Sequence, residues 1–389
     1  MKKVSFLFLL WIFSTLCSMA QHKDINRIIQ AVQEKYAPDR RVVVFDIKSS
    51  LQNDTIVLEG ETSHPDAYND LLKQVSGNVK NNIRLLPDEV IGEKNRGVIY
   101  NSVEKLHSSN SYGSETVSEV LLGMPVKLLD KKGGWRRLQT PEGYIGWVSE
   151  AIKTMTETEL REYNQKQKVV VTSLYALSYE KANVKSQTVS NLVIGDMLVL
   201  KRSKGKFYQV TYPDGREAYI QKSDTKELKK WLKDIEFTQE SIVKTGKKFM
   251  GVPYVWGGTS SKGLDCSGFT KLVYFLHGVI LPRDASQQVL TGKLIDEKGD
   301  FSNVQPGDLV FFGTKATDEN PRERVVHVAI YIGNKRFIHA SDYIQIGSFD
   351  PADSFYDEYN TNRYLRTKRI IGEVNTKGLD AIFENEFYR

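Results

Sequence analysis

The chain repeats itself at a constant spacing of 72 residues, and this repeat restricts its fold more than any other feature. Residues 114–118 (SETVS) align with residues 186–190 (SQTVS), and Trp147 aligns with Tyr219. Both copies contain short runs of β-branched and aromatic residues that are separated by Gly and Asp turns. Such runs are typical of small β-barrels. We therefore predict two successive barrels of similar structure.

The length of 389 residues predicts further domains on both sides of the repeat. Before it, Ile25 to Tyr36 has helical spacing, and residues 41–47 and 55–58 are rich in strand formers, which predicts a small α+β lobe. The predicted segments are an export signal (1–20), this lobe (21–95), the first barrel (96–155), the second barrel (166–228), a catalytic domain (237–372) and a C-terminal tail (373–389).

The N-terminus has the composition of an export signal. Lys2 and Lys3 precede an apolar stretch that ends at Leu16, and residues 18–20 form a small-x-small cleavage site. The apolar stretch is shorter than the ~20 residues of a membrane span. We therefore expect export to the periplasm or the cell exterior without stable membrane insertion, as a monomer.

Composition argues against several partners. The net charge of +6 is small and spread along the chain. There is no basic stripe with interleaved aromatic residues, so nucleic acid is not an expected partner. The sequence has no zinc-ligand spacing of Cys and His, and we expect neither a metal nor a cofactor.

Cleavage after Ala20 would remove Cys17 and leave Cys266 as the only cysteine. Exported proteins tend to pair their cysteines, so a single unpaired one is a candidate reactive thiol. Cys266 precedes an apolar run with the spacing of one helix face, formed by Phe269, Leu272, Val273 and Leu276. A thiol at a helix N-terminus feels the positive end of the helix dipole, which favours the thiolate. The alternative is a buried structural cysteine.

Two histidines lie on a predicted hairpin after Cys266. Residues 325–332 and 336–340 read as strands, and a three-residue loop between them would make His339 the diagonal neighbour of His327 on one face. A two-residue turn would put the two rings on opposite faces. His327 could then accept the thiol proton while His339 orients its ring. The alternative is a pair of core histidines.

The two barrels differ at two positions that could bind a ligand. The first has Glu115 and Tyr144 where the second has Gln187 and Arg216. A carboxylate and a phenol are suited to holding an ammonium group. An ordinary solvated surface is the alternative explanation.

Four motifs together resemble those of the NlpC/P60 cysteine peptidases. They are Asp265-Cys266-Ser267-Gly268, the turn and strand at 306–312, the strand at 327–333, and Ile338-His339-Ala340. The repeat resembles bacterial SH3 domains. The implied fold class is α+β, with a papain-like NlpC/P60 core preceded by two small SH3-like barrels and a small α+β lobe. This order of domains resembles the γ-D-glutamyl-L-diamino acid endopeptidases (dipeptidyl-peptidase VI) of that family.

The resemblance also implies roles for individual residues. Cys266 would be the nucleophile, His327 the base, His339 the third polar residue, and Tyr254 a donor to the oxyanion. The implied substrate-binding residues are Glu115, Tyr144, Asp265, Ser267, Asp284, Ala285 and Ser286. Members of the family often carry Ser directly after that Asp, whereas this chain has Ala285 and then Ser286.

The expected partners are peptidoglycan-derived peptides, L-Ala-γ-D-Glu-diamino acid, with meso-diaminopimelate as the first expectation for the diamino acid. The expected reaction is hydrolysis after γ-D-Glu. One alternative is a hydrolase of intact stem peptides that uses the SH3-like pair as anchors, and another is a non-catalytic wall-binding protein. A lipid acyltransferase on the same fold is a third, which the SH3-like pair disfavours.

Overall fold

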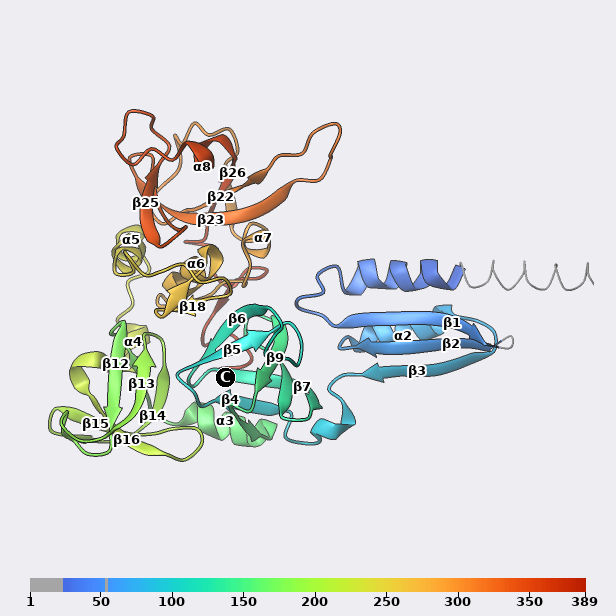
Figure 1. Cartoon of the computed structure of the whole chain (residues 1–389), viewed down its shortest axis with the longest axis horizontal. Coiled ribbons are helices and arrows are strands. Elements are labelled where there is room, and N and C mark those ends of the chain that lie inside the picture. Colours follow the sequence, from blue (N-terminus) through green and yellow to red (C-terminus); the bar gives the residue numbers. More distant parts are fainter. Residues whose placement is uncertain (1–23, 53–54) are drawn as a thin grey trace, which may run out of the picture.

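A computed structural model describes residues 24–52 and 55–389, and the predicted export signal therefore lies outside the described residues. Figure 1 shows the N-terminal lobe on one side, two strand-rich units below, and the catalytic domain above them. The described residues contain no helix that is both long and apolar enough to span a membrane.

The N-terminal lobe is a three-stranded sheet with helical segments on it. Residues 24–36 are helical, as predicted. Strand β1 (Phe45–Gln52) pairs antiparallel with β2 (Thr55–Thr62), and β2 pairs parallel with β3 (Val79–Leu85) through the connecting helix α2 (Pro65–Gln74). The short 3₁₀ helix η1 (Glu89–Ile91) follows.

The predicted strand at residues 41–47 is wrong in its first half, because residues 41–43 form a turn and β1 begins at Phe45. The backbone of this turn bonds to the next domain instead of to the lobe's own sheet. The carbonyl of Arg41 accepts the Ile145 N–H at 2.7 Å, and that of Val42 accepts the Gln139 side-chain amide at 3.0 Å. The turn is thereby held against the first of the two seven-stranded sheets.

The two strand-rich units are seven-stranded sheets. The first consists of β4 (Arg96–Ile99), β5 (Val103–His107), β6 (Thr116–Leu121), β7 (Pro125–Lys132), β8 (Trp135–Gln139), β9 (Ile145–Ser149) and β10 (Ile152–Met155). After helix α3 (Glu157–Gln165), the second consists of β11 (Lys168–Val171), β12 (Tyr175–Tyr179), β13 (Thr188–Val193), β14 (Met197–Lys204), β15 (Phe207–Thr211), β16 (Glu217–Gln221) and β17 (Thr225–Glu227). Helices η2 (Lys222–Asp224) and α4 (Leu228–Lys233) flank β17.

The internal repeat is confirmed in the order of the strands. The first sheet has the order β10-β4-β7-β8-β9-β5-β6, and the second has β17-β11-β14-β15-β16-β12-β13, which is the same order with seven added to each number. The strands β4 to β9 and β11 to β16 also begin 72 residues apart, as in 96 and 168 or 145 and 217. The two copies therefore share one topology.

The catalytic domain has a six-stranded sheet of order β21-β26-β22-β23-β24-β25. Its strands are β21 (Lys293–Asp296), β22 (Leu309–Thr314), β23 (Arg324–Gly333), β24 (Arg336–Ala340), β25 (Ile344–Ser348) and β26 (Tyr364–Arg369). Its helices are α5 (Gln239–Lys247), α6 (Cys266–Phe275), α7 (Ala285–Gln288) and α8 (Glu358–Asn362). Short pairs are formed by β18 (Thr259–Ser260) with β19 (Gly263–Leu264), and by β20 (Val279–Ile280) with β27 (Asp380–Ala381) of the tail.

Helix α6 packs its predicted apolar face on this sheet. Phe269 and Val273 are fully buried, and they share a core with Val328 and Ile330 of β23 and with Ile338 of β24. Burying a side chain of this size contributes about 1.5–3 kcal/mol. The packing fixes the first turn of α6 against the middle of the sheet.

The first seven-stranded sheet is attached to the catalytic domain by polar contacts. Thr259 donates its backbone N–H to the Glu119 carboxylate at 2.8 Å, and burial raises the pKa of that carboxyl group. On the other side of the sheet, Lys271 of α6 forms a buried ion pair with Glu142 at 3.3 Å. Glu142 lies two residues before Tyr144, so this pair holds the turn that carries Tyr144 against α6.

Candidate active site

A pocket of about 560 Å³ lies where the catalytic domain, the first seven-stranded sheet and the N-terminal lobe meet. Cys266 lines it, and this residue is the one cysteine in the described part of the chain and is unpaired. It is the first residue of α6, as predicted, because Asp265 caps the helix by accepting the Gly268 N–H at 2.7 Å.

The surroundings of the Cys266 thiol favour its protonated form. Burial raises its pKa to about 12, and the charge of Asp265 adds to this rise. Hydrogen bonds from the backbone of Val328 and Ser267 favour the thiolate, but they do not offset burial. The predicted effect of the helix dipole, which favours the thiolate, is thus opposed by the burial of a residue that is only 9% exposed.

The two histidines form a hydrogen-bonded pair. Nε2 of His327 lies 3.0 Å from Nδ1 of His339, and both rings are buried. Burial lowers the pKa of both rings, that of His327 well below its usual range and that of His339 to about 4. Burial thus favours the neutral form of both imidazoles.

The prediction that His327 and His339 share one face is confirmed, although the connecting turn differs from the expected three-residue loop. Asn334 and Lys335 form a two-residue turn, with φ of 53° and 57°. A bulge between Tyr331 and Gly333 adds the residue that this turn lacks, and Ile330 still pairs with Ile338. The register is thus the one that brings the two rings together.

Asp357 completes a chain of polar groups behind the histidines. Its Oδ2 lies 3.9 Å from Nε2 of His339, and its charge favours a proton on that nitrogen. Nδ1 of His339 would then accept a hydrogen bond from Nε2–H of His327. In that tautomer, Nδ1 of His327 carries no proton. This tautomer is the one that a base toward the thiol requires.

Cys266 and His327 lie on facing elements. The sulfur is within hydrogen-bonding reach of the backbone N–H of Val328, the residue after His327. Among residues 24–52 and 55–389, no direct hydrogen bond joins the thiol to the imidazole. Burial disfavours the charged form of both groups, because it raises the pKa of the thiol and lowers that of His327.

Tyr254 lies in the loop before α6 and lines the same pocket. Burial raises the pKa of its hydroxyl group to about 12, and the nearby charge of Asp265 adds to the rise. The hydroxyl therefore stays protonated at neutral pH. Within the described residues it makes no hydrogen bond, so it is free to donate to a charge that develops beside the sulfur.

Asp265 and Ser267 line the pocket, but the buried Arg283 already uses much of their hydrogen-bonding capacity. Its Nη2 lies 2.5 Å from Oδ2 of Asp265, and its Nη1 donates to the Ser267 hydroxyl at 3.0 Å. Nε donates to Ser118 of the first seven-stranded sheet at 3.0 Å. Arg283 thus fixes the residues beside the nucleophile to the neighbouring domain, a function that the sequence did not reveal.

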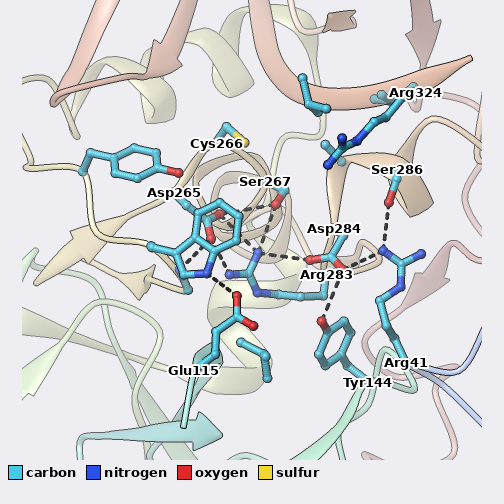
Figure 2. A pocket seen from close by; sticks show the side chains of 17 residues that line it. Arg41, Glu115, Tyr144, Asp265, Cys266, Ser267, Arg283, Asp284, Ser286 and Arg324 are labelled. Atoms are coloured by element: carbon cyan, nitrogen blue, oxygen red, sulfur yellow. Dashed lines mark hydrogen bonds and ion pairs between the residues drawn. The ribbon is translucent and has the colours of Figure 1, made fainter. Parts of the chain in front are cut away.

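Glu115, Tyr144 and Asp284 all line the pocket. The Tyr144 hydroxyl donates to Oδ2 of Asp284 at 3.2 Å, and burial raises the pKa of that hydroxyl. Oε1 of Glu115 accepts Nε1–H of Trp256 at 2.8 Å. In the described structure Oε2 of Glu115 has no hydrogen-bond partner, and the Tyr144 oxygen keeps its lone pairs. In the view of Figure 2, Glu115, Tyr144 and Asp284 lie below Cys266.

The sequence missed Arg41, which reaches the pocket from the N-terminal lobe. Its Nη1 donates to Oδ2 of Asp284 and to the Ser286 hydroxyl, both at 2.8 Å (Figure 2). The strand predicted for residues 41–47 would have hidden this side chain within the lobe. Ala285, between Asp284 and Ser286, is buried and offers only apolar surface. Arg324, also missed, lines the pocket from β23.

Comparison with known families agrees with this geometry. A profile described as the NlpC/P60 family matches residues 251–369, and one described as the bacterial dipeptidyl-peptidase SH3 domain matches residues 106–151. Neither match includes the N-terminal lobe.

Curated proteins with similar sequences include two γ-D-glutamyl-L-lysine dipeptidyl-peptidases. The one from Bacillus cereus is 34% identical over 273 residues, which is 67% of this chain and 78% of that protein. The one from Bacillus subtilis is 27% identical and covers 57% of this chain and 71% of that protein. A crystal structure of an NlpC/P60 family protein from Bacillus cereus superposes with a TM-score of 0.59 at 26% identity, over 70% of this chain and 99% of the other.

Proposed function

The chain belongs to the NlpC/P60 family of cysteine peptidases, and we propose that it hydrolyses the γ-D-glutamyl bond of small peptidoglycan peptides that begin with a free L-Ala. The diamino acid after that bond is L-Lys, as in the name of the Bacillus cereus relative, or meso-diaminopimelate. The observation that carries the proposal is the pocket itself, in which Cys266 shares a wall with two ammonium-binding candidates, Glu115 and Tyr144, of the SH3-like sheet.

The acylation step uses the neutral thiol and the histidine pair. As the sulfur of Cys266 attacks the γ-carbonyl carbon of D-Glu, its proton passes to Nδ1 of His327. The C=O π electrons move onto the oxygen, which accepts hydrogen bonds from the Tyr254 hydroxyl and the Cys266 backbone N–H. When the tetrahedral intermediate collapses, the C–N bond breaks, His327 protonates the leaving amine, and a thioester remains on the sulfur.

Water completes the reaction. His327 accepts a proton from a water molecule whose oxygen attacks the thioester carbon, the C–S bond breaks, and the sulfur recovers the proton. The products are L-Ala-D-Glu and the peptide or amino acid that begins with the diamino acid. His339 orients His327 in both steps, and Asp357 favours the tautomer that both steps need.

The residues of the pocket explain why the enzyme would prefer substrates with a free N-terminal amine. An ammonium group would meet Oε2 of Glu115, the Tyr144 oxygen and the Asp284 carboxylate. An N-acylated or longer chain would cover these acceptors without supplying a positive charge, which a polar site rejects. Intact stem peptides, whose L-Ala is acylated by the glycan strand, are then poor substrates.

Mass spectrometry of the products tests the proposal. Incubation with L-Ala-γ-D-Glu-L-Lys or the diaminopimelate analogue should release L-Ala-D-Glu, and Cys266→Ala should release none. Insoluble wall sacculi should be cleaved far more slowly than either peptide. Faster cleavage of sacculi would favour a wall hydrolase, and identical behaviour of the native chain and Cys266→Ala would favour a wall-binding protein.

We also propose that the protein acts outside the cytoplasm as a monomer. Support comes from the composition of residues 1–20, since Lys2 and Lys3 precede an apolar stretch and a small-x-small site. Fractionation of cells expressing the full chain, with the N-terminus of the mature protein sequenced, tests the location. An N-terminus at Gln21 in the exported fraction is the expected result.

A further inference from the structure

Arg41 places a fixed positive charge in the pocket from outside the regions that the two family profiles match. Its side chain is 38% exposed, and Asp39 holds it in a two-point contact, with Nε and Nη2 each 2.8 Å from a carboxylate oxygen. Asp39 is itself held by the Gln287 amide at 2.7 Å. The guanidinium is therefore oriented before any ligand arrives.

Hydrogen-bond donors remain unused on this side of the pocket. Of the five N–H groups of Arg41, two are directed to Asp39, one to Asp284 and one to Ser286, and the second N–H of Nη2 meets no acceptor in the described structure. Ser286 accepts from Arg41, and within the described residues its own O–H has no acceptor. Two adjacent donors next to a positive charge form a site for an anion.

The pocket is divided by charge. Figure 2 shows Glu115 on one side, Arg41 and Arg324 on the other, and Asp284 between them. Asp284 pairs with Arg41 at 2.8 Å, so Glu115 is the carboxylate left to face an ammonium group. Arg324 and the unused donors of Arg41 and Ser286 face the other side of the pocket. A ligand that carries one positive and one negative group a few bonds apart matches this arrangement.

We infer that Arg41, together with Ser286, binds the free α-carboxylate of the γ-linked D-glutamyl residue and makes the enzyme selective for it. The inference rests on the proposed function, because a γ-linked glutamyl residue keeps its α-carboxylate one residue away from the terminal ammonium. The N-terminal lobe is then part of the substrate site, and Arg41 is a specificity-determining residue.

The test compares two substrates that differ only in this group. They are L-Ala-γ-D-Glu-L-Lys and its α-carboxamide, L-Ala-γ-D-isoglutaminyl-L-Lys. The ratio of their kcat/KM values is measured for the native chain, Arg41→Gln and Ser286→Ala. The matched control is Arg40→Gln, because Arg40 is adjacent in sequence, 60% exposed, and near only Asp46 at 4.0 Å.

The native chain should prefer the carboxylate about ten- to hundredfold, which corresponds to the loss of hydrogen bonds to a charged group. Arg41→Gln should bring the ratio close to one, Ser286→Ala should reduce it, and Arg40→Gln should leave it unchanged. If Arg41 only held the lobe in place, Arg41→Gln would slow both substrates equally and keep the ratio, and the inference would be wrong.

Equal cleavage of both substrates by the native chain would also overturn the inference while leaving the proposed function intact. Failure of the native chain to cleave either substrate would instead refute the proposed function, and the inference with it. The two failures are therefore distinguishable in one set of assays.

Discussion

Replacing Glu115 by Gln tests whether the SH3-like sheet recognises the substrate's amine. Gln keeps the size of the side chain and an oxygen that can accept the Trp256 N–H, but it removes the charge. Asp284 is already paired with Arg41 and Tyr144, so Glu115 is the carboxylate of this pocket with its charge unmatched. An ammonium group should depend on it more than on Asp284.

The magnitude follows from exposure. A hydrogen bond between charged groups contributes about 1.5–3 kcal/mol when solvent is excluded. Glu115 is exposed in the free protein, so water must be removed from its carboxylate when the ammonium group binds. This cost reduces the net contribution to the lower end of that range. We expect kcat/KM for L-Ala-γ-D-Glu-L-Lys to fall about tenfold. The free energy of unfolding should change by less than about 0.5 kcal/mol, because the side chain has one hydrogen bond at the surface.

The assay measures kcat/KM for this peptide and for its N-acetyl derivative, with urea unfolding of the same samples. Glu180→Gln, on the exposed surface of the second sheet, is the matched control. Glu115→Gln should lower the preference for the free amine, and Glu180→Gln should not. A loss that is equal for both peptides, or that matches a loss of stability, would refute amine recognition by Glu115.

Three further predictions concern the catalytic domain. Tyr254→Phe removes only a hydroxyl and should lower kcat about 10²–10³-fold with little change in KM; a loss confined to KM would exclude the oxyanion role. Because burial lowers the pKa of His339 to about 4 while the unfolded ring titrates near 6.5, the unfolded state binds more protons between these values. The free energy of unfolding should therefore fall as the pH is lowered from 6.5 to 4, and His339→Gln should make this fall smaller in urea titrations. Gly257→Ala should destabilise the loop before α6, because its Cβ would lie 2.4 Å from the Thr116 carbonyl oxygen at a φ of +79°, and unchanged thermal unfolding would contradict this contact.

Local patterns in the sequence were sufficient to predict that Cys266 lies at the start of a helix. The spacing of Phe269 and Val273 predicted the buried face of α6, whereas the cap that Asp265 forms before Cys266 was seen only in the structure. This pattern depends on interactions within four residues along the helix. The burial of the sulfur depends on other elements that pack over it, so local patterns did not indicate that burial would raise its pKa.

The histidine pair shows how a correct result can depend on a detail that the sequence left open. Turn length alone would place His327 and His339 on opposite faces, and the bulge after Tyr331 restores the shared face. Nothing in the local sequence distinguishes a three-residue loop from a two-residue turn with a bulge.

The sequence also did not predict contacts between residues that lie far apart along the chain. Arg41 and Asp284 are 243 positions apart, and Arg283 and Ser118 are 165 apart, so no local pattern links them. A run of valines after Arg41 favoured a strand, while hydrogen bonds to the neighbouring sheet held this backbone in a turn. Contacts between domains therefore determine that Arg41 lines the pocket.

The central claim is that Cys266 carries the acyl group during turnover. Reactions with L-Ala-γ-D-Glu-L-Lys, quenched in acid within the first turnover, can be digested and analysed by mass spectrometry for a thioester. We predict an L-Ala-γ-D-Glu adduct on the peptide that contains Cys266, which is lost in Cys266→Ala and strongly reduced in His327→Ala. Product formation by Cys266→Ala at the native rate, or an adduct on another residue, would contradict the account.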